Sequence, residues 1–338
     1  MKALQCTSPG RLEMQEVDKP TLQKDYALLR ILRIGICGTD LHAFEGTQPY
    51  FSYPRILGHE LAAELVDIDG SSEFQRGELV TFIPYFNCGS CPMCKAGRTN
   101  CCQNLKVCGV HIDGGMTEYL LVPTKFLIKV KRLRVDEIAL IEPLAIAMHA
   151  IRRANVQPGE QVVVAGAGPI GFGVIEYARS QGAFVTVIDV NEDRLAFCRD
   201  TLKINQIIHA THVDAFETLR DLTHGQMADV VFDATGNLQA LQNGFRYMSH
   251  GSRYVLVGLQ LREISFSHPE FHKREGTLMS SRNATRSDFE SVIQSIEERR
   301  IDPLKMISHH VKFDVVSESF PVWLNPKSKT LKAIVELD

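Results

Sequence analysis

Four cysteines in one short segment form the most specific metal-binding pattern in the sequence. Cys88, Cys91 and Cys94 are separated by two residues each, and Cys102 follows after seven more. Four thiolates at this spacing predict a closed tetrahedral site for a structural zinc ion, which leaves no position for a substrate. Disulfides between cysteines this close are disfavoured in a reducing compartment. Cys101 precedes Cys102 directly, so the spacing alone leaves open which of the two is the fourth ligand.

A second group of residues with metal-binding chemistry lies upstream and is of mixed type. Cys37, Thr39, Asp40 and His42 occur within six residues, and the pair His59-Glu60 follows a Leu-Gly step. A catalytic zinc usually takes three protein ligands from Cys, His and carboxylates and keeps one open position. A single Cys or His is most simply a core residue. Their combination, in a chain that also carries the dinucleotide-binding motif described below, instead favours a catalytic zinc.

Glu142 is an acid embedded in the apolar run of residues 140–144, where a buried charge needs a partner. It is interpreted as a further zinc ligand, as a group bonded to zinc-bound water, or as a carboxylate at a helix start that interacts with the helix dipole. His111, near the turn at 113–115, is a candidate for the substrate pocket, with a core or surface role as the alternative.

A glycine-rich turn predicts a dinucleotide site in the second half of the chain. The apolar run 161–165 leads into Gly166-Ala-Gly168-Pro169-Ile170-Gly171, a helical pattern follows, and a second apolar run ends at Asp189. This is the strand–turn–helix context with a terminal acid that a Gly-x-Gly-x-x-Gly motif requires. The helix N-terminus receives the pyrophosphate, and the carboxylate accepts hydrogen bonds from the adenosine ribose. The predicted dinucleotide contacts are Gly166, Gly168, Pro169, Ile170, Gly171, Asp189, Arg194 and Thr235.

Length and composition set the frame for these sites. With 338 residues and 44% hydrophobic composition, the chain is expected to form two domains with substantial cores. The net charge of −3, with acids and bases interspersed, argues against nucleic-acid and membrane-surface partners, including the zinc-knuckle alternative for the four cysteines. The sequence shows neither a signal-peptide core nor a membrane-length apolar run, so we expect a cytoplasmic protein.

The elements that position these residues follow from the apolar patterns. Short alternating runs over residues 1–33 predict strands of an antiparallel, barrel-like domain, and the tail from 309 to 338 reads as strand-like runs that rejoin it. Strands at 161–165, 184–188, 228–233 and 252–257 alternate with helical segments, which predicts a doubly wound parallel sheet, with 277–281 closing its edge. Residues 286–300 have the spacing of an amphipathic helix.

Taken together, these motifs resemble the zinc-containing medium-chain dehydrogenases, the group of alcohol, polyol and threonine dehydrogenases. The resemblance covers essentially the whole chain: GICGTD (35–40), GHE (58–60), the four cysteines, EP (142–143) and GAGPIG (166–171). Segments 51–60, 109–115 and 269–285 look most like the bacterial L-galactonate 5-dehydrogenase branch and its sugar-acid and polyol relatives. The resemblance implies a GroES-like catalytic domain (1–152 and 287–338, with the zinc lobe at 86–104), a Rossmann domain (153–286), and an active-site cleft between them.

The resemblance also implies roles for individual residues. It places Cys37 and His59 on the catalytic zinc, with Glu60 and Glu142 as direct ligands or as groups one layer out. Thr39 matches the hydroxyl that touches the substrate oxygen, and His42 matches a later proton-relay group. Family spacing selects Cys102 over Cys101 for the structural zinc, which gives two zinc ions per chain.

The expected reaction moves a hydride from a secondary alcohol of a sugar acid or polyol to NAD, with L-galactonate at C5 as the preferred substrate. Asp189 disfavours the 2′-phosphate of NADP. A substrate carboxylate would need a cation, for which Arg282 and Lys273 are candidates. The alternatives are a sorbitol, threonine or simple-alcohol dehydrogenase with the same machinery, and a non-catalytic zinc protein that senses NAD. By analogy we expect a homodimer or homotetramer.

Overall fold

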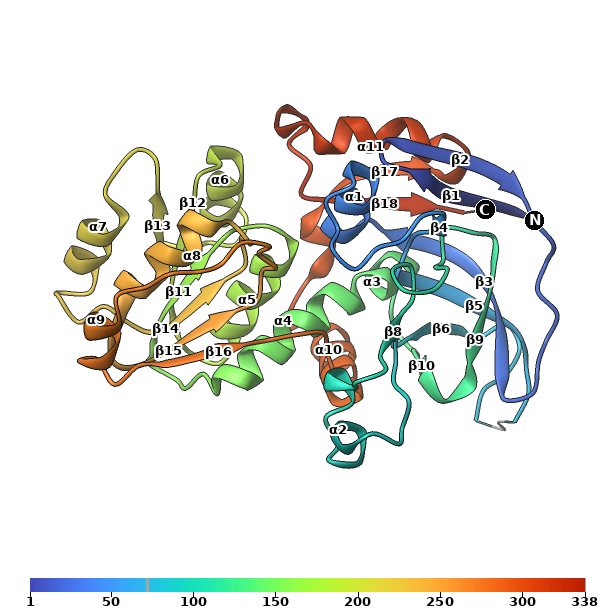
Figure 1. Ribbon diagram of the computed structural model, residues 1–338, viewed down its shortest axis with the longest axis horizontal. Coiled ribbons are helices and arrows are strands. Elements are labelled where there is room, and N and C mark those ends of the chain that lie inside the picture. The colour runs from blue at the N-terminus through green and yellow to red at the C-terminus, as the bar shows by residue number, and fades with distance from the viewer. Residues whose placement is uncertain (71–72, 338) are drawn as a thin grey trace. The chain divides into compact units, whose positions relative to one another are not determined.

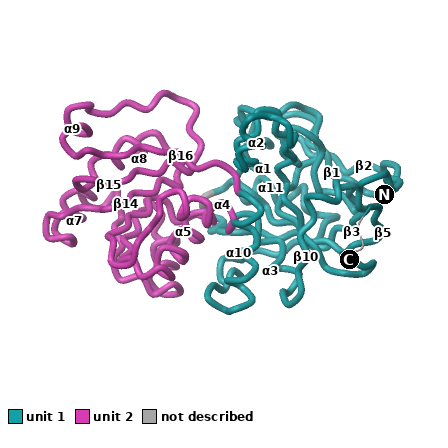
Figure 2. The backbone as a smooth tube through the Cα atoms, turned by 90° about the horizontal axis from the view of Figure 1, so that it is seen from below, with its two compact units in different colours: residues 1–143, 285–338 teal, residues 144–284 magenta. Residues whose placement is uncertain are grey.

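The computed structural model describes residues 1–70 and 73–337, which form two compact units. One unit combines residues 1–143 with 285–338, and the other comprises residues 144–284 (Figure 2). The chain therefore leaves the first unit once and returns to it. We describe each unit by itself.

Unit 1 is built mainly from strands (Figure 1). Its largest sheet has the order β10-β6-β5-β3-β18-β17, and β9 also pairs with β3. A three-stranded sheet has the order β2-β1-β4, and β7 pairs with β8. Apart from the parallel pair β17–β18, these pairings are antiparallel, as predicted for this domain. The strands are β1 (Lys2–Ser8), β2 (Arg11–Glu16), β3 (Tyr26–Gly35), β4 (Arg55–Ile56), β5 (Glu60–Ile68), β6 (Leu79–Phe82), β7 (Tyr85–Phe86), β8 (Lys106–Val107), β9 (Tyr119–Pro123), β10 (Leu127–Lys129), β17 (Ile307–Lys312) and β18 (Lys332–Glu336).

Short helices connect these strands. They are α1 (Gly38–Glu45), α2 (Pro92–Lys95), α3 (Val135–Ala139), α10 (Arg286–Glu297) and α11 (Val316–Leu324). The amphipathic helix predicted for residues 286–300 is present as α10, and its apolar residues Phe289, Val292 and Ile296 are buried on one face. The prediction of strand-like runs for the whole tail was wrong in its middle, where α11 forms. Val316, Phe320 and Trp323 are buried at helical spacing, and the ring of Phe320 packs 5.5 Å from that of Phe44.

Unit 2 contains one six-stranded parallel sheet with the order β13-β12-β11-β14-β15-β16. In chain order this is 3-2-1-4-5-6, the doubly wound arrangement that binds dinucleotides beyond the carboxyl ends of the central strands. Buried β-branched side chains fill the central strands, as parallel sheets covered on both faces require. Its elements are α4 (Ile141–Ala154, which starts in unit 1), β11 (Gln161–Ala165), α5 (Pro169–Ser180), β12 (Phe184–Asp189), α6 (Glu192–Asp200), β13 (Gln206–His209), α7 (Ala215–Leu222), β14 (Ala228–Asp233), α8 (Leu238–Gly244), β15 (Met248–Leu256), α9 (His268–His272) and β16 (Thr277–Ser280).

The boundary between the units lies inside α4 and not at residue 152, where the sequence placed it. The physical reason is the packing of this helix. A Cβ atom at Gly173 on α5 would lie 2.5 Å from the Cβ of Ala147 and 3.1 Å from Leu144. Most of α4 therefore belongs to the core of unit 2, while Glu142 in its first turn belongs to unit 1.

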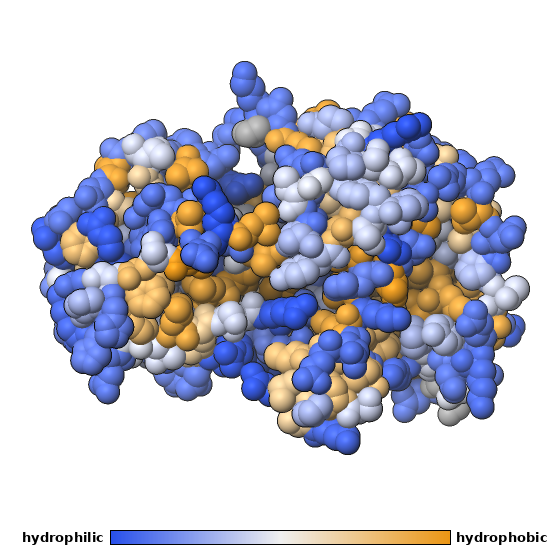
Figure 3. Space-filling view, viewed as in Figure 1, coloured by the Kyte–Doolittle hydropathy of each residue, from blue (hydrophilic) through white to orange (hydrophobic). Residues whose placement is uncertain are grey.

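The surface is mixed in character. Hydrophilic side chains cover much of the face in Figure 3, with apolar side chains between them. Among the described residues, no helix combines the length and apolar content that crossing a membrane requires.

Candidate metal centres and dinucleotide site

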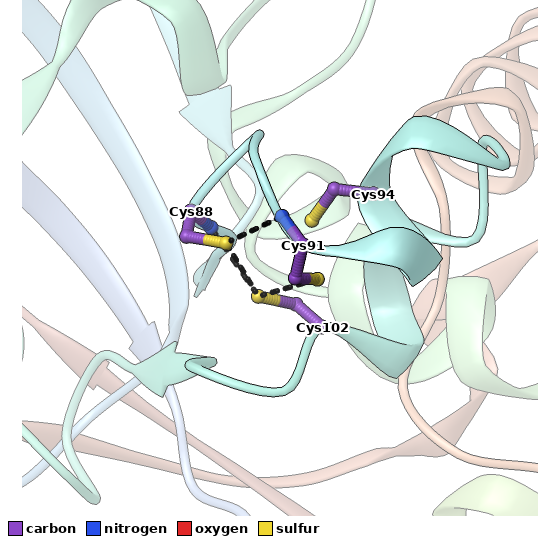
Figure 4. Close-up of side chains that lie close together, drawn as sticks. All are labelled: Cys88, Cys91, Cys94 and Cys102. Atoms are coloured by element: carbon purple, nitrogen blue, oxygen red, sulfur yellow. Dashed lines mark hydrogen bonds between the residues drawn. The ribbon is translucent and has the colours of Figure 1, made fainter.

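The four predicted cysteines meet in a lobe between β7 and β8. The ligand atoms of Cys88, Cys91, Cys94 and Cys102 all lie within 4.8 Å of one another, and Cys101 is not part of the group. Figure 4 shows the four side chains converging: Cys88 comes from the loop after β7, Cys91 and Cys94 from α2 and its start, and Cys102 from the residue after a short 3-10 helix. Pairing of β7 with β8 holds the two ends of the lobe together.

Hydrogen-bond donors around the lobe stabilise negative sulfur. The backbone N–H groups of Cys91 and Cys88 donate to the Sγ atoms of Cys88 (3.4 Å) and Cys102 (3.3 Å). The Ser90 hydroxyl and the backbone N–H groups of Ser90 and Cys91 lower the pKa of Cys88 to about 5, whereas burial raises the pKa of Cys102 to about 11. Thiolate ligands with N–H donors and no other ligand type fit a closed structural zinc site.

The second predicted group also assembles. The ligand atoms of Cys37, His59 and Glu60 lie within 4.8 Å of one another. Cys37 directly precedes α1, His59 directly precedes β5, and Glu60 is the first residue of β5. Gly35 pairs with Glu60 across β3 and β5, and a Cβ at this position would collide with the Glu60 side chain. The glycine thus makes room for the carboxylate.

Asp40 joins the two loops of this group. Its carboxylate, which is fully buried, accepts hydrogen bonds from the backbone N–H of Cys37 (2.9 Å) and of Gly58 (3.1 Å). Its Oδ1 atom also lies 3.8 Å from Nδ1 of His59. Asp40 therefore positions both ligand-bearing loops.

The electrostatic environment of this second group favours a bound cation. Burial acts to lower the pKa of His59, but Asp40 and Cys37 outweigh it and raise the pKa well above its usual value. Nδ1 of His59 is buried without a hydrogen-bond partner among the described residues. The negative groups that favour a proton on this imidazole would equally favour a divalent metal in its place. The donor set of thiolate, imidazole and carboxylate therefore fits zinc.

Lys332, which the sequence analysis missed, neutralises Glu60. Its side chain is 1% exposed, and Nζ lies 2.7 Å from both Glu60 oxygens and 3.0 Å from the Ile36 carbonyl oxygen. Burial acts to lower the pKa of Lys332, but Glu60 and then Cys37 raise it above its ordinary value. The signal in the sequence was a cation inside the apolar strand pattern 332–336, the same kind of signal that drew attention to Glu142.

Glu142 has one bonded oxygen and one free oxygen. Tyr85, also missed by the sequence analysis, donates its hydroxyl hydrogen to Oε1. Oε2 is buried without a partner among the described residues. Burial raises the pKa of Glu142 to about 7, an effect that His59 opposes and Glu60 reinforces. An unpaired buried acceptor beside the Cys37–His59 group can receive a metal ion or a water molecule bound to one.

The two candidate proton-relay residues lie on α1. Thr39 is half-buried in the first turn, and His42 is exposed three residues later, on the same face of the helix. Nδ1 of His42 lies 3.1 Å from the Thr47 hydroxyl and 3.3 Å from a Glu45 oxygen.

The predicted dinucleotide motif has the local geometry that its sequence implies. Gly166 has φ +96°, and a Cβ there would lie 2.9 Å from Thr235, so both the turn and the close approach need glycine. Gly168 caps α5, with Pro169 at its first position. The side chain of Arg194 on α6 reaches toward Gly168, with Nη1 3.8 Å from the place where a Cβ would be.

Asp189 ends β12 beside this turn. Oδ2 accepts the Ala167 N–H (2.6 Å), and Oδ1 accepts the N–H groups of Val190 (2.7 Å) and Asn191 (2.9 Å). A carboxylate oxygen has two lone pairs, so Oδ2 can still accept from a ribose hydroxyl.

The three residues predicted as candidates for substrate binding, His111, Lys273 and Arg282, are not part of either metal-binding cluster. Nδ1 of His111 accepts the backbone N–H of Val107 (3.0 Å), which is a local turn contact. Lys273 forms a surface ion pair with Glu270 (2.7 Å) in unit 2, where Arg282 is also exposed.

Comparisons with known proteins identify the class. Residues 23–132 match the alcohol dehydrogenase GroES-like domain, and residues 169–298 match the zinc-binding dehydrogenase domain. The chain belongs to the zinc-type alcohol dehydrogenase family, and it is an oxidoreductase of that family. The predicted family, fold class and enzyme class are confirmed, as are the predicted cofactors, NAD and zinc.

Individual relatives and solved structures resemble the chain over nearly its whole length. The chain is 42% identical to L-galactonate-5-dehydrogenase of Escherichia coli over 95% of its own length and 94% of that protein, and 31% identical to sorbitol dehydrogenase of Halalkalibacterium halodurans over 91% and 92%. An E. coli dehydrogenase solved with NADH superimposes with a TM-score of 0.93 at 27% identity, covering 100% of this chain and 99% of that one. A Sinorhizobium meliloti zinc-binding dehydrogenase bound to NADP gives 0.92 at 26%, covering 99% of each chain.

Proposed function

We propose that this protein oxidises a secondary alcohol of a sugar acid or polyol with NAD as hydride acceptor, and that its substrate is L-galactonate, oxidised at C5. The reaction class is supported by the cluster of Cys37, His59 and Glu60 and by the Oε2 atom of Glu142, which is buried without a partner among the described residues. The substrate is supported by the 42% identity to an L-galactonate-5-dehydrogenase over nearly the whole chain.

Cys37 and His59 would hold the catalytic zinc. Glu60 is engaged by Lys332 through both oxygens, which favours a supporting role, whereas the free Oε2 of Glu142 favours contact with the metal or its water. When bound, zinc supplies Lewis acidity that lowers the pKa of a coordinated hydroxyl group. The four-cysteine lobe would hold the second, structural zinc.

Thr39 and His42 would move the hydroxyl proton. The Thr39 hydroxyl would accept the proton from the substrate oxygen while releasing its own hydrogen in the direction of His42, and the exposed His42 imidazole would deliver a proton to solvent. Because Nδ1 of His42 faces Thr47 and Glu45, its Nε2 atom is the one free to exchange the proton. The remaining alkoxide can then release the hydride from its carbon to the nicotinamide ring.

Asp189 would make NAD the preferred cofactor. A 2′-phosphate beside this carboxylate would be repelled, and the next two residues, Val190 and Asn191, offer no cation to bind it. A like-charge contact of this kind costs several kcal/mol, so we expect kcat/KM to be at least about 100-fold higher with NAD than with NADP. Steady-state kinetics with both cofactors measure this ratio, and equal values would show that Arg194 or another cation accepts the phosphate.

A substrate panel with matched pairs tests the proposal. Purified zinc-loaded protein is mixed with NAD and, in turn, L-galactonate, galactitol, sorbitol, L-threonine and ethanol, and NADH formation is followed. Galactitol retains the secondary hydroxyl groups of L-galactonate but lacks the carboxylate, so it isolates the contribution of that charge. We expect the highest kcat/KM for L-galactonate. A higher value for an uncharged alcohol would contradict the sugar-acid assignment, and no NADH from any substrate would contradict the dehydrogenase mechanism.

A cytoplasmic location and a homodimeric or homotetrameric state complete the proposal and rest on analogy with the family. Light scattering after size-exclusion chromatography measures the second of these.

A further inference from the structure

Tyr85 lies on the strand that leads into the four-cysteine lobe, and its hydroxyl bonds to Glu142. It is the first residue of β7 and is 4% exposed. Its hydroxyl donates to Oε1 of Glu142, and its ring packs edge-on against Phe289 at 6.3 Å. The next side chain, Phe86, points to the other face of the strand and stacks on Phe126 at 4.8 Å. Aromatic contacts therefore hold both faces of β7, and the Phe289 contact together with the Glu142 bond fixes the direction of the tyrosine side chain.

The bond from Tyr85 decides which oxygen of Glu142 remains available. Oε1 is occupied by the tyrosine hydroxyl, and Oε2 is buried and unpaired among the described residues. Without the tyrosine, both oxygens would be free and the carboxylate could rotate. Groups that orient a metal-binding side chain in this way are known to contribute to metal affinity.

The same strand also forms the base of the four-cysteine lobe. Tyr85 pairs with Val107 and Phe86 pairs with Lys106, and all four cysteines lie between these two strands. Cys88 follows Tyr85 after two residues, and the side-chain amide of Asn87 donates to Sγ of Cys94 at 3.5 Å. Closing the lobe around a metal thus fixes the strand that carries the tyrosine.

We propose that Tyr85 is a positioning residue that couples the four-cysteine lobe to the second metal centre, so that metal in the lobe strengthens metal binding at Cys37 and His59 through the Tyr85–Glu142 hydrogen bond. The inference rests on the proposed function in one respect, the presence of a metal at Cys37 and His59. It adds a role for a residue that is not itself a metal ligand but bonds to Glu142, and a second role for the lobe beyond stability.

The first experiment compares Tyr85→Phe with Tyr254→Phe. Tyr254 is a buried tyrosine of unit 2 whose hydroxyl donates to the Leu241 carbonyl oxygen (2.8 Å), so the control removes the same atom from an equally buried site. Each protein is loaded with zinc, and its release to a chromogenic chelator is followed. In Tyr85→Phe we expect one of two zinc equivalents to be released at about 10- to 100-fold lower chelator concentration, with the other unchanged.

The Cys37→Ser variant, which keeps only the lobe metal, identifies which equivalent has moved. Tyr254→Phe should release both equivalents as the unmodified protein does. If Tyr85→Phe also does so, the inference is overturned while the proposed function stands. If the unmodified protein holds only the lobe zinc, both fail together.

The second experiment tests the coupling without altering Tyr85. Cys94→Ser, which removes one thiolate from the lobe, should weaken zinc retention at the second centre by a similar factor. In the Tyr85→Phe background the same substitution should have no further effect on that centre, because the connection is already absent. Equal effects of Cys94→Ser in both backgrounds would show that the lobe acts by another route and would overturn the proposal.

Discussion

The four-cysteine lobe and the Cys37–His59 group are both candidate zinc sites of unit 1, but they are assembled in opposite ways. The lobe draws its four thiols from one segment of the chain, and the two outermost cysteines are 14 residues apart. The second group comes from the segments at the starts of α1 and β5, and its buried neighbours Glu142 and Lys332 come from α4 and β18. The contact of Lys332 with Ile36 spans 296 residues. The lobe has a single ligand type, surrounded by N–H donors. The second group combines a thiol, an imidazole and the Glu60 carboxylate, with the buried carboxylates of Asp40 and Glu142 nearby.

This difference has a chemical meaning. A local set of identical soft ligands saturates a metal and stabilises the fold around it. A mixed set assembled from distant segments leaves the metal an open position and depends on its neighbours for charge balance. Loss of a lobe ligand should therefore reduce stability first, and loss of a ligand from the mixed group should reduce activity first.

The largest expected effect is on activity. Cys37→Ser should lower kcat/KM by at least about 10³-fold, because Lewis-acid stabilisation by a metal is worth several kcal/mol in the transition state. The bound zinc should fall from two to one per chain, and the thermal midpoint should change little. Kinetics together with metal analysis by mass spectrometry measure both quantities. Retained turnover would remove the metal at Cys37 from the mechanism.

The next largest effect concerns charge balance in the mixed group. Lys332→Met leaves the buried Glu60 carboxylate without its cation and should lower the free energy of unfolding by about 3–5 kcal/mol. Adding Glu60→Gln should recover most of this loss, since the uncompensated charge is then gone. Urea unfolding of both variants measures the effect, with Lys305→Met, an exposed lysine, as the control. A loss that Glu60→Gln does not recover would mean that the lysine acts mainly through packing.

A smaller effect, on stability, distinguishes Cys102 from the adjacent Cys101 as the fourth ligand of the lobe. Cys102→Ala should lose the lobe zinc and about 3 kcal/mol of stability at free zinc near 100 times the dissociation constant, whereas Cys101→Ala should keep both metals. Thermal unfolding at fixed free zinc compares the two variants. The opposite result would assign the fourth ligand to Cys101.

The smallest effect concerns Glu137, a buried glutamate outside both candidate zinc sites. Glu137 on α3 accepts hydrogen bonds from Arg134 (2.9 Å) and Arg299 (2.7 Å). Burial acts to raise the pKa of Glu137, but Arg134 and Arg299 outweigh it and lower the pKa below 4.5. Its stabilising contribution is therefore complete above pH 4.5 and disappears as the pH falls through the lowered value.

Glu137→Gln should accordingly cost about 1–2 kcal/mol at pH 7, a modest value because both arginines are largely exposed. The difference from the unmodified protein should shrink below pH 4.5. Denaturant unfolding at pH 7 and pH 4 measures it. A difference that stays constant with pH would assign the effect to packing and not to charge.

Sequence reasoning predicted those features that depend on neighbouring residues. The lobe, the glycine turn and the strands of unit 2 follow from local spacing and apolar pattern. The mixed group was predicted because Cys37 and His59 belong to recognisable motifs. Tyr85 and Lys332 were not predicted, because only the folded chain brings Tyr85 to Glu142 and Lys332 to Glu60. The helix α11 was missed because its apolar residues were read at strand spacing.

The position of Lys332 on β18 also sets an order of events during synthesis. A ribosome adds about 5–20 residues per second, so the chain reaches Lys332, 272 residues after Glu60, about 14–54 s after it has made Glu60. During that interval the nascent chain already carries Glu60 but lacks the only strand that supplies its buried cation in the described structure. The lobe, whose ligands emerge together, can take up zinc early. The mixed centre must wait for β18, which makes it the later of the two sites to mature.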